Sequence, residues 1–473
     1  MLFNSLPFIF LFLPITLVGY FWLCAHRMGI GARVWLVIAS LFFYSAWNVS
    51  YLPLILVSMV FNFLVGTGLN RIDNKYKKLL LTFGVVVNVL LLGYFKYIDF
   101  MIENLNAVTG LAINAKNIAL PLAISFFTFQ QIAYLVDSYR GLTRGYNFLN
   151  YSLFVTFFPQ LIAGPIVAHY EMMPQFASLR NWVKNYRHIF IGVFLFLIGL
   201  FKKVMIADYF AGFANTGFDT MSELTTLQAW FVSLSYTIQI YFDFSGYCDM
   251  AMGLARMFNI NLPINFNSPY KALNIQDFWR RWHITLSRFL RDYIYIPLGG
   301  NRRGYSRALA NVFMVFLIGG LWHGAAWTFV VWGVLHGLAN IIWRVWHKMN
   351  FHMKKWLAWF ITFNFVNIAW VFFRATSFHD AWKVLRAMFD LTHLFTPQNL
   401  KFFGSGIYLT FAIVIALIVG CVMLPNSIEL VKHVKVTDKK SALMWGGGLA
   451  IVAVVILVKM IMIPYTEFIY FNF

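Results

Sequence analysis

Long apolar runs, separated by short polar intervals, follow one another along almost the whole chain. A helix needs about 20 apolar residues, with about 17–25 the usual range, to cross the hydrocarbon core of a bilayer. The pattern therefore predicts an all-α polytopic membrane protein with about 11–12 transmembrane helices. The stronger candidates are residues 6–24, 79–97, 118–136, 189–206, 227–244, 311–330, 356–373, 407–424 and 444–464, and the weaker ones are 34–47, 52–69 and 332–346.

Three further apolar stretches contain helix breakers or charges and are not expected to be plain spans. Proline breaks a helix interior, and non-helical backbone at membrane depth is tolerated only where protein or a watery cavity shields it. We expect re-entrant or interfacial elements that line a cavity, with amphipathic helices on the membrane surface as the alternative. The stretches are 154–167 with Pro159, Gly164 and Pro165, 247–267 with Asp249 and Arg256, and 284–298 with Arg288, Arg291 and Asp292.

The composition agrees with a membrane protein that forms one domain. Hydrophobic residues make up 60% of the 473 residues and charged residues only 11%, whereas soluble domains carry about 25% charged residues. We expect a single multi-pass domain over 1–473, with its catalytic core at 118–345. The run 6–24 lacks the flanks of a cleavable signal peptide, so it is expected to be a retained span. Three distant cysteines, Cys24, Cys248 and Cys421, are expected to be buried free thiols.

The net charge of +20 is interpreted as a sign of topology. No soluble basic domain is present to bind nucleic acid, and Lys and Arg collect in the cytoplasmic loops of membrane proteins. The largest basic cluster covers 271–307. The helix breakers gather between 154 and 307 rather than in corresponding halves, which argues against an inverted-repeat transporter.

His323 is an isolated histidine in the apolar run that starts near Asn311 and continues past Trp332. An ionisable side chain in such a run costs a few kcal/mol and by default marks a functional site. A buried imidazole stays neutral and suits a general base that deprotonates a hydroxyl. The alternative is a core histidine that donates to a backbone carbonyl.

Two other histidines lie close in sequence. His283 follows the aromatic and cationic segment 278–282 and is expected to bind, orient or assist in the same cavity, or else to stack on tryptophan as a structural residue. His336 lies thirteen residues after His323, about 220° round a continuous helix, so the two would not share a face. His336 is therefore expected in helix packing, and no metal site is predicted.

A glycine turn at 298–304 carries arginines and is a candidate phosphate site. Backbone amides and guanidinium groups match phosphate oxygens, although a plain cytoplasmic loop would also be basic. Asp243 and Asp249 lie six residues apart, about 240° round a helix, so each is expected to pair with an arginine rather than with the other. The candidate donor-binding residues are Arg280, Arg281, Arg302, Arg303, Asn301, Trp279 and Trp322, and the supporting ones are Asp243, Ser245, Asp249, Asp277 and Gly324.

Several of these segments together resemble the membrane-bound O-acyltransferase (MBOAT) family, and within it most of all the bacterial alginate O-acetyltransferase membrane subunits. The likeness covers nearly the whole chain and includes the ending 468–473. It implies the MBOAT fold, with transmembrane helices and re-entrant elements around a central cavity or tunnel. The segments that carry it are 158–165, 201–204, 241–247, 277–287, 291–293, 298–302 and 319–324.

The resemblance also implies roles. His323 is similar to the family's essential histidine at the bottom of a cavity, and His283 to its second signature position. The implied donor is a cytoplasmic thioester, here acetyl-CoA as a substrate, with no tightly bound cofactor. The implied partners are a secreted or anchored serine-type acetyltransferase, an exopolysaccharide acceptor and membrane lipid. The implied location is the bacterial cytoplasmic (inner) membrane.

The prediction is thus an O-acetyltransferase that moves an acetyl group across the membrane to an extracytoplasmic polysaccharide such as alginate, with cellulose and peptidoglycan also open. Either His323 deprotonates the acceptor or it relays the acetyl group covalently. One alternative is D-alanyl transfer to teichoic acid from a carrier protein. A proton-coupled anion transporter is the alternative from another class, since membrane histidines and acids can form proton relays.

Overall fold

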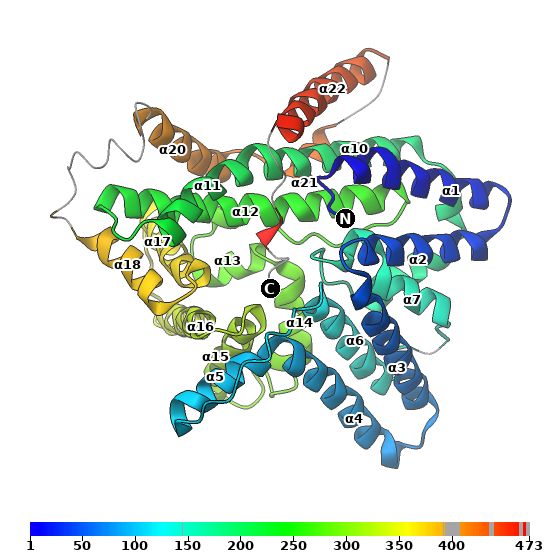
Figure 1. Cartoon of the computed structure of the whole chain (residues 1–473), viewed down its shortest axis with the longest axis horizontal. Helices are drawn as coiled ribbons and strands as arrows, with labels where there is room; N and C mark the ends of the chain where they lie inside the picture. Colours follow the sequence, from blue (N-terminus) through cyan, green and yellow to red (C-terminus); the bar gives the residue numbers. More distant parts are fainter. Residues whose placement is uncertain (144, 391, 393–406, 435–438, 463–466, 470–473) are drawn as a thin grey trace. The chain divides into compact units, whose positions relative to one another are not determined.

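The structure is a computed structural model that describes all residues except 144, 391, 393–406, 435–438, 463–466 and 470–473, so part of the ending 468–473 lies outside the described residues. Every regular element in the described part of the chain is a helix (Figure 1). The predicted all-α class is confirmed. Contacts group the chain into two compact units, and the expected single domain over 1–473 stays a prediction.

The first unit comprises Met1–Gly199, Tyr247–Pro263 and Met460–Phe473. Within it α1 packs on α2, and α3, α4 and α6 pack on one another (Figure 1). Its main helices are α1 (Leu13–Ala25), α2 (Gly29–Ser45), α3 (Leu52–Arg71), α4 (Asn74–Leu92), α5 (Ile98–Thr109), α6 (Ile124–Tyr139), α7 (Phe148–Thr156), α8 (Phe158–Leu161), α9 (His169–Ala177) and α10 (Tyr186–Phe201).

The second unit comprises Leu200–Gly246 and Ile264–Lys459 and holds both candidate histidines. Its helices α15, α16 and α17 pack in sequence, and α13 packs on α14 and α16. The helices are α11 (Asp208–Asn215), α12 (Thr226–Met257, whose last turns belong to the first unit), α13 (Ile275–Arg281), α14 (Ile284–Leu290), α15 (Tyr305–His323), α16 (Trp327–Lys348), α17 (Lys355–Arg374), α18 (Phe378–Phe389), α20 (Ile407–Met423), α21 (Ser427–His433) and α22 (Lys439–Met462, whose end from Met460 belongs to the first unit).

Glycines let α15 and α16 approach each other closely. A Cβ on Gly320 would lie 2.4 Å from the carbonyl oxygen of Phe329, and one on Gly333 would lie 2.6 Å from that of Phe316. Helices in membranes associate through such small residues because they bring the two backbones together. This contact fixes the positions of the side chains that the two helices carry.

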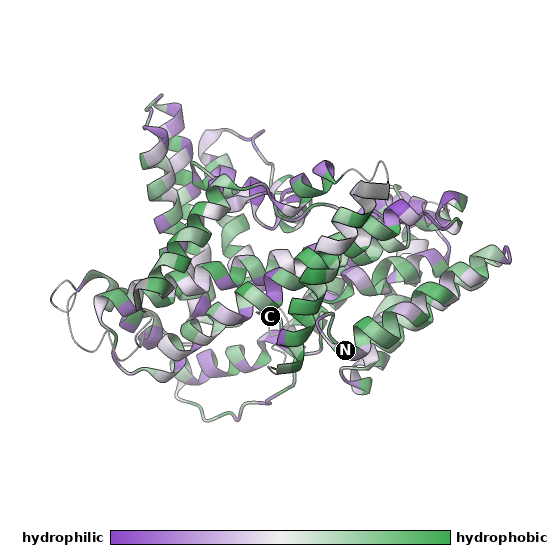
Figure 2. Cartoon of the chain, turned by 90° about the horizontal axis from the view of Figure 1, so that it is seen from above, coloured by the Kyte–Doolittle hydropathy of each residue, from purple (hydrophilic) through white to green (hydrophobic). Residues whose placement is uncertain are grey.

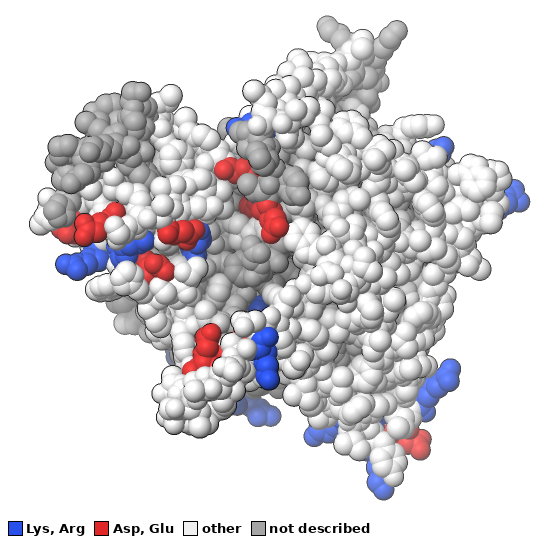
Figure 3. Space-filling view, in the orientation of Figure 1, with Lys and Arg blue, Asp and Glu red and all other residues white. Residues whose placement is uncertain are grey.

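In the described part of the chain, eight helices are long and apolar enough to cross a membrane, or up to nine if the bent pair Leu409–Met423 and Ser427–His433 forms one span. The long helices are mainly apolar in Figure 2, and Figure 3 shows charged side chains in a few separate groups on a face that is otherwise uncharged. The protein is a multi-pass membrane protein. Three of the twelve expected spans are not among these eight or nine helices. The helices α2, with 17 residues, and α6, with 16, are too short, and α12, which contains 227–244, is long enough but not sufficiently apolar.

The structure corrects the expected organisation of two segments. Residues 247–257 continue α12 as a regular helix, so the stretch 247–267 is broken only in its second half. The run 311–330 is not one span, because α15 ends at His323 and α16 begins at Trp327. The stretches 154–167 and 284–298 form short helices and turns, as their breakers predict.

Candidate active site

His323 is the last residue of α15 and its side chain is buried. Three aromatic rings surround the imidazole, with centroid distances of 4.9 Å to Trp322, 5.1 Å to Trp332 and 5.0 Å to Phe373. These rings come from α15, α16 and α17. Three helices of the second unit therefore position this histidine.

Gly324 follows the end of α15 next to the histidine, and a side chain there would displace the ring of Phe329. A Cβ at this position would lie 2.0 Å from Cε2 of Phe329. The Phe329 ring in turn packs on Phe373, at 5.1 Å between centroids. The absence of a side chain at Gly324 thus allows the packing that fixes Phe373 against His323.

His283 is fully buried and adopts a left-handed backbone conformation, with φ 43°, at the start of α14. Its Nδ1 lies 3.1 Å from Oδ1 of Asn265. The same oxygen accepts hydrogen bonds from the backbone N–H of Thr285, at 3.2 Å, and from its hydroxyl, at 2.9 Å. A backbone N–H can only donate, so the asparagine atom is the oxygen and Nδ1 of His283 is the donor. The lone pair of the neutral ring therefore lies on Nε2.

Burial lowers the pKa of His283 from 6.5 to about 3. The imidazole is therefore neutral at pH 7, because the charged form would lose its hydration. A ring with such a low pKa is a poor acceptor of a full proton but a good acceptor of a hydrogen bond at Nε2. This suits orientation of a hydroxyl or an imidazole better than general-base catalysis.

Trp322 connects the two candidate histidines. Its ring centroid lies 6.3 Å from that of His283 and 4.9 Å from that of His323. The prediction that both histidines belong to one site agrees with this arrangement. Because the Trp322 side chain is buried between them, a role in holding the rings is better supported than the expected contact with the donor.

His336 is buried in the packing between helices, as predicted, and belongs to the same cluster. Its centroid lies 4.7 Å from that of Trp332, whose ring also contacts His323. The expected angle of about 220° between His323 and His336 does not apply, because the break at 324–326 separates α15 from α16, and α16 packs back along α15. Trp279, a candidate donor-binding residue, donates its Nε1–H to Nδ1 of His336 at 3.2 Å.

The glycine–arginine turn has the conformation that its sequence requires. Gly299, Gly300 and Gly304 have φ values of +106°, +53° and +87°, which glycine adopts without strain. Arg302 and Arg303 are exposed in this turn. The side chain of Asn301, also exposed, accepts a hydrogen bond from the Tyr295 hydroxyl, and Asn311 of α15 donates to the carbonyl of Gly300 at 3.1 Å.

The turn and His323 lie at opposite ends of α15. This helix has 19 residues, which corresponds to roughly 28 Å along its axis. Arg302 and Arg303 therefore cannot contact a group that reacts at His323. Arg280 is exposed at the end of α13, and Arg281 forms an ion pair with Asp277 at 3.0 Å.

The carboxylates of α12 are buried, but Asp243 pairs with a lysine rather than with the expected arginine. Nζ of Lys203 lies 2.7 Å from Asp243 and 2.8 Å from Asp208. Ser245 lies 3.5 Å from Nζ of Lys202. Asp249 is buried in the last turns of α12, within the first unit.

Sequence reasoning missed Asn265, Trp332 and Phe373. Asn265 precedes His283 by 18 residues and belongs to an asparagine-rich segment, which is a weak signal. Trp332 and Phe373 could not be recognised as site residues from the sequence, because 19% of the residues in this chain are aromatic. Among the described residues no three His, Cys, Asp or Glu side chains gather as metal ligands, and no metal centre is assigned.

Two buried histidines held by aromatic rings in a multi-pass helical membrane protein define a candidate acyl-transfer site. The sequence pattern of the membrane-bound O-acyltransferase (MBOAT) family matches residues 10–379, and the chain belongs to this family. It is an O-acyltransferase, which replaces the transporter alternative.

Individual relatives cover most of the chain. It is 54% identical over 422 residues to a peptidoglycan O-acetyltransferase of Helicobacter pylori, covering 83% of this chain and 80% of the relative. It is 41% identical over 399 residues to a protein named "Probable alginate O-acetylase" of Pseudomonas aeruginosa, covering 82% and 75%. It is 28% identical over 276 residues to a teichoic acid D-alanyltransferase of Bacillus subtilis, covering 54% and 69%.

Proposed function

We propose that the protein transfers acetyl groups from a cytoplasmic acyl thioester, acetyl-CoA, to a polysaccharide outside the bacterial cytoplasmic membrane, and that this polysaccharide is peptidoglycan. The support for acetyl transfer is the likeness to O-acetyltransferases. The support for peptidoglycan over alginate is the identity of 54% to the peptidoglycan enzyme against 41% to the alginate relative.

The observation that carries the proposed chemistry is the chain of rings from His283 through Trp322 to His323. His323 is the group that removes the proton from an attacking hydroxyl, or that attacks the thioester itself. In the first case the hydroxyl oxygen bonds to the acyl carbon, the carbon–sulfur bond breaks, and the imidazolium returns the proton to the CoA thiolate. Nε2 of His283 accepts a hydrogen bond that orients the reacting group.

The length of α15 favours a donor whose charged end lies far from its thioester. Arg302 and Arg303 lie roughly 28 Å along the helix from His323. The pantetheine arm of acetyl-CoA covers part of this distance, and the arginine side chains and the pyrophosphate would span the rest. Arg280 and Arg281 are further candidates for the same phosphates, and a serine-type acetyltransferase outside the membrane is the proposed partner that completes transfer to the polymer.

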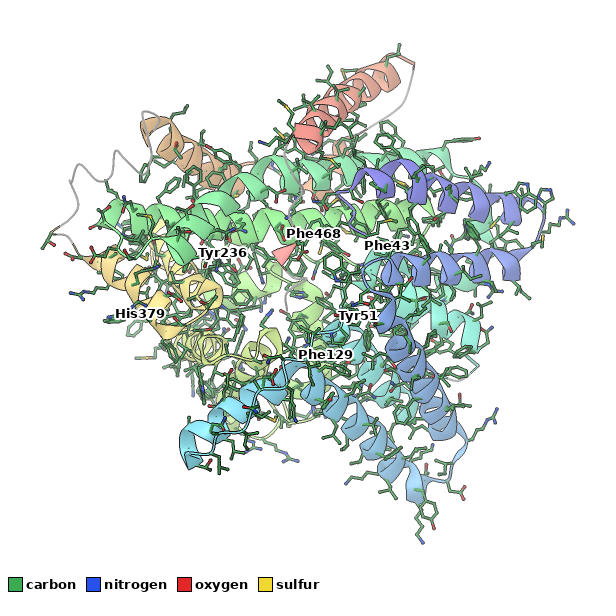
Figure 4. All side chains as sticks on the ribbon, in the orientation of Figure 1. Phe43, Tyr51, Phe129, Tyr236, His379 and Phe468 are labelled. Carbon is green, nitrogen blue, oxygen red and sulfur yellow. The ribbon has the colours of Figure 1, made fainter. Side chains whose placement is uncertain are left out.

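The experiment that tests this function replaces His323 by alanine and measures O-acetyl groups on peptidoglycan fragments by mass spectrometry. Loss of a general base lowers rates by about 10²–10⁴-fold, so acetylation should fall to background at an unchanged level of membrane-inserted protein. His379→Ala is the matched control, because His379 of α18 is highly exposed (Figure 4). Full acetylation of peptidoglycan in the His323→Ala strain would contradict the proposal.

D-alanyl transfer from a carrier protein remains a second candidate because of the likeness to the teichoic acid enzyme. A carrier protein presents its thioester on the same kind of pantetheine arm, so the geometry of α15 fits both donors. Binding of radiolabelled acetyl-CoA to the purified protein separates them. Saturable binding supports acetyl-CoA as the donor, whereas no binding together with D-alanine on the host's teichoic acid supports the carrier.

A further inference from the structure

His336, which the proposed chemistry does not use, has a defined tautomer. The imidazole is fully buried on α16, and its Nδ1 accepts a hydrogen bond from the indole N–H of Trp279 at 3.2 Å. An indole nitrogen can only donate, so Nδ1 carries the lone pair. The proton of the neutral ring therefore lies on Nε2, which points away from Trp279.

Among the residues that the structure describes, several buried N–H donors of this cluster have no hydrogen-bond partner. They are Nε2 of His336, Nε1 of Trp332 and Nε1 of Trp370, whose ring packs on Trp332. Buried donors are nearly always paired, because burial removes the water that would otherwise accept the bond. Two of them on neighbouring rings, with centroids 4.7 Å apart, indicate a site for a ligand with an oxygen atom.

These donors belong to the same aromatic cluster as His323. The Trp332 ring contacts His323 on one side and His336 on the other, at centroid distances of 5.1 and 4.7 Å. Trp370 and Phe373 also pack on Trp332 and are apolar at their ring faces. A small apolar group with a single carbonyl oxygen is the chemical complement of such a cluster, and an acetyl group has this form.

We propose that Nε2–H of His336, together with Nε1–H of Trp332, donates hydrogen bonds to the carbonyl oxygen of the acyl group that reacts at His323. The inference rests on the proposed acetyl transfer and assigns a catalytic residue to it. The carbonyl oxygen gains negative charge when the acyl carbon is attacked, and fixed donors in a site without water stabilise that charge. No bond to His336 forms or breaks.

A merely structural His336 would pack its N–H against the aromatic ring faces. Two substitutions separate the roles. His336→Phe keeps an aromatic ring and removes both nitrogens, whereas His336→Gln keeps an N–H donor and an oxygen that can accept from Trp279. If the donor matters, His336→Phe should lower kcat for thioester cleavage by about 10²-fold, with a KM for acetyl-CoA near that of the unchanged protein. His336→Gln should retain more of kcat.

A spectroscopic experiment reports the contact without turnover. Acetyl-CoA with carbon-13 at the acetyl carbonyl is bound to the purified full-length His323→Ala protein, and the carbonyl stretch is recorded by infrared difference spectroscopy. We expect a shift to lower wavenumber on binding, which is lost when His336→Phe is added and kept when His336→Gln is added. Trp332→Phe, which removes the second donor, supplies the same comparison if His336→Phe does not fold.

The outcomes are distinguishable. If acetyl-CoA does not bind to the His323→Ala protein, the proposed donor is wrong and the assignment of His336 falls with it. If acetyl-CoA binds but its carbonyl stretch is the same with and without His336→Phe, the proposed function stands and the inference is overturned. A wild-type kcat in the His336→Phe protein would overturn it as well.

Discussion

At the scale of single residues, the hydrogen bonds of Asn265 decide what His283 can do. Its Oδ1 holds Nδ1 of the imidazole at 3.1 Å and thereby leaves the lone pair on Nε2. Because burial lowers the pKa of His283 to about 3, this lone pair is present throughout the physiological pH range. The site therefore keeps one acceptor whose state does not change with pH.

Asn265→Asp should make this acceptor sensitive to pH. A carboxylate beside the ring favours the imidazolium, so the pKa of His283 should rise from about 3. As the pH falls through the raised pKa, Nε2 gains a proton and can no longer accept. We expect the activity of the Asn265→Asp protein to fall toward pH 5, because Nε2 of His283 then no longer accepts a hydrogen bond. The activity of the unchanged protein should not fall for this reason.

The measurement is the initial rate of CoA release from acetyl-CoA against pH, with purified protein. Asn350→Asp is the matched control, because Asn350 is exposed after the end of α16. If Asn265→Asp and Asn350→Asp give superimposable pH profiles, the role assigned to His283 is wrong.

The sequence identified His323 because a histidine is expensive in an apolar run, and His283 because it follows the aromatic and cationic segment 278–282. It could not identify Asn265, Trp332 or the place of His336, since these depend on which segments fold together. Apolar and aromatic residues are so frequent in this chain that a functional ring looks the same as a packing ring. The predicted partner of Asp243 was wrong for the same reason. Without the positions of the helices, Lys203 and an arginine are equally plausible partners.

At the scale of helices, apolar length predicted the class of fold but not every boundary. The break between α15 and α16 consists of Gly324, Ala325 and Ala326, which are as compatible with an apolar run as the helices beside them. Conversely, Asp249 and Arg256 suggested a break where α12 continues. Arg256 is accommodated because its side chain contacts Nε2 of His188 at 2.8 Å, a partner distant in sequence.

Two adjacent glycines of α15 should respond differently to substitution by alanine. A Cβ on Gly320 would lie 2.4 Å from a backbone oxygen of α16, which cannot move without separating the helices. A Cβ on Gly319 would lie 3.5 Å from a side-chain atom of Leu290, an ordinary contact. Gly320→Ala should therefore destabilise the protein by about 1–3 kcal/mol and lower activity, while Gly319→Ala should be nearly neutral.

Two measurements check the Gly319→Ala and Gly320→Ala proteins: the melting temperature in detergent and the activity in the acetylation assay. Since alanine favours helices more than glycine does, Gly319→Ala can even raise the melting temperature slightly. Equal melting temperatures for the two variants would show that the close contact of α15 with α16 does not stabilise the protein, and equal activities would show that it does not position the histidines.

At the scale of the whole molecule, the hairpin of α15 and α16 separates two groups of residues. The basic turn at 299–304 and Lys348 lie at one end of the hairpin, and His323 lies at the other. These helices pack as a hairpin, and Nζ of Lys348, near the end of α16, lies 4.2 Å from the ring centroid of Tyr305, at the start of α15. The basic turn at 299–304 and the basic end of α16 are therefore at one end. At the other end His323 contacts Phe373, next to the last residue of α17.

This order predicts which segments face the cytoplasm. Lys and Arg favour the cytoplasmic ends of spans, so Arg303 and Lys354 should lie inside the cell and His379, beyond the end of α17, outside it. Single cysteines at these three positions can be tested in a Cys421→Ser background, since Cys24 and Cys248 are buried. A membrane-impermeant maleimide should label His379→Cys in intact cells, and should label Arg303→Cys and Lys354→Cys only in inside-out vesicles.

The opposite pattern would place the arginine turn away from cytoplasmic acetyl-CoA and refute the proposed route of the donor. Labelling of all three from one side would instead show that α17 does not cross the membrane.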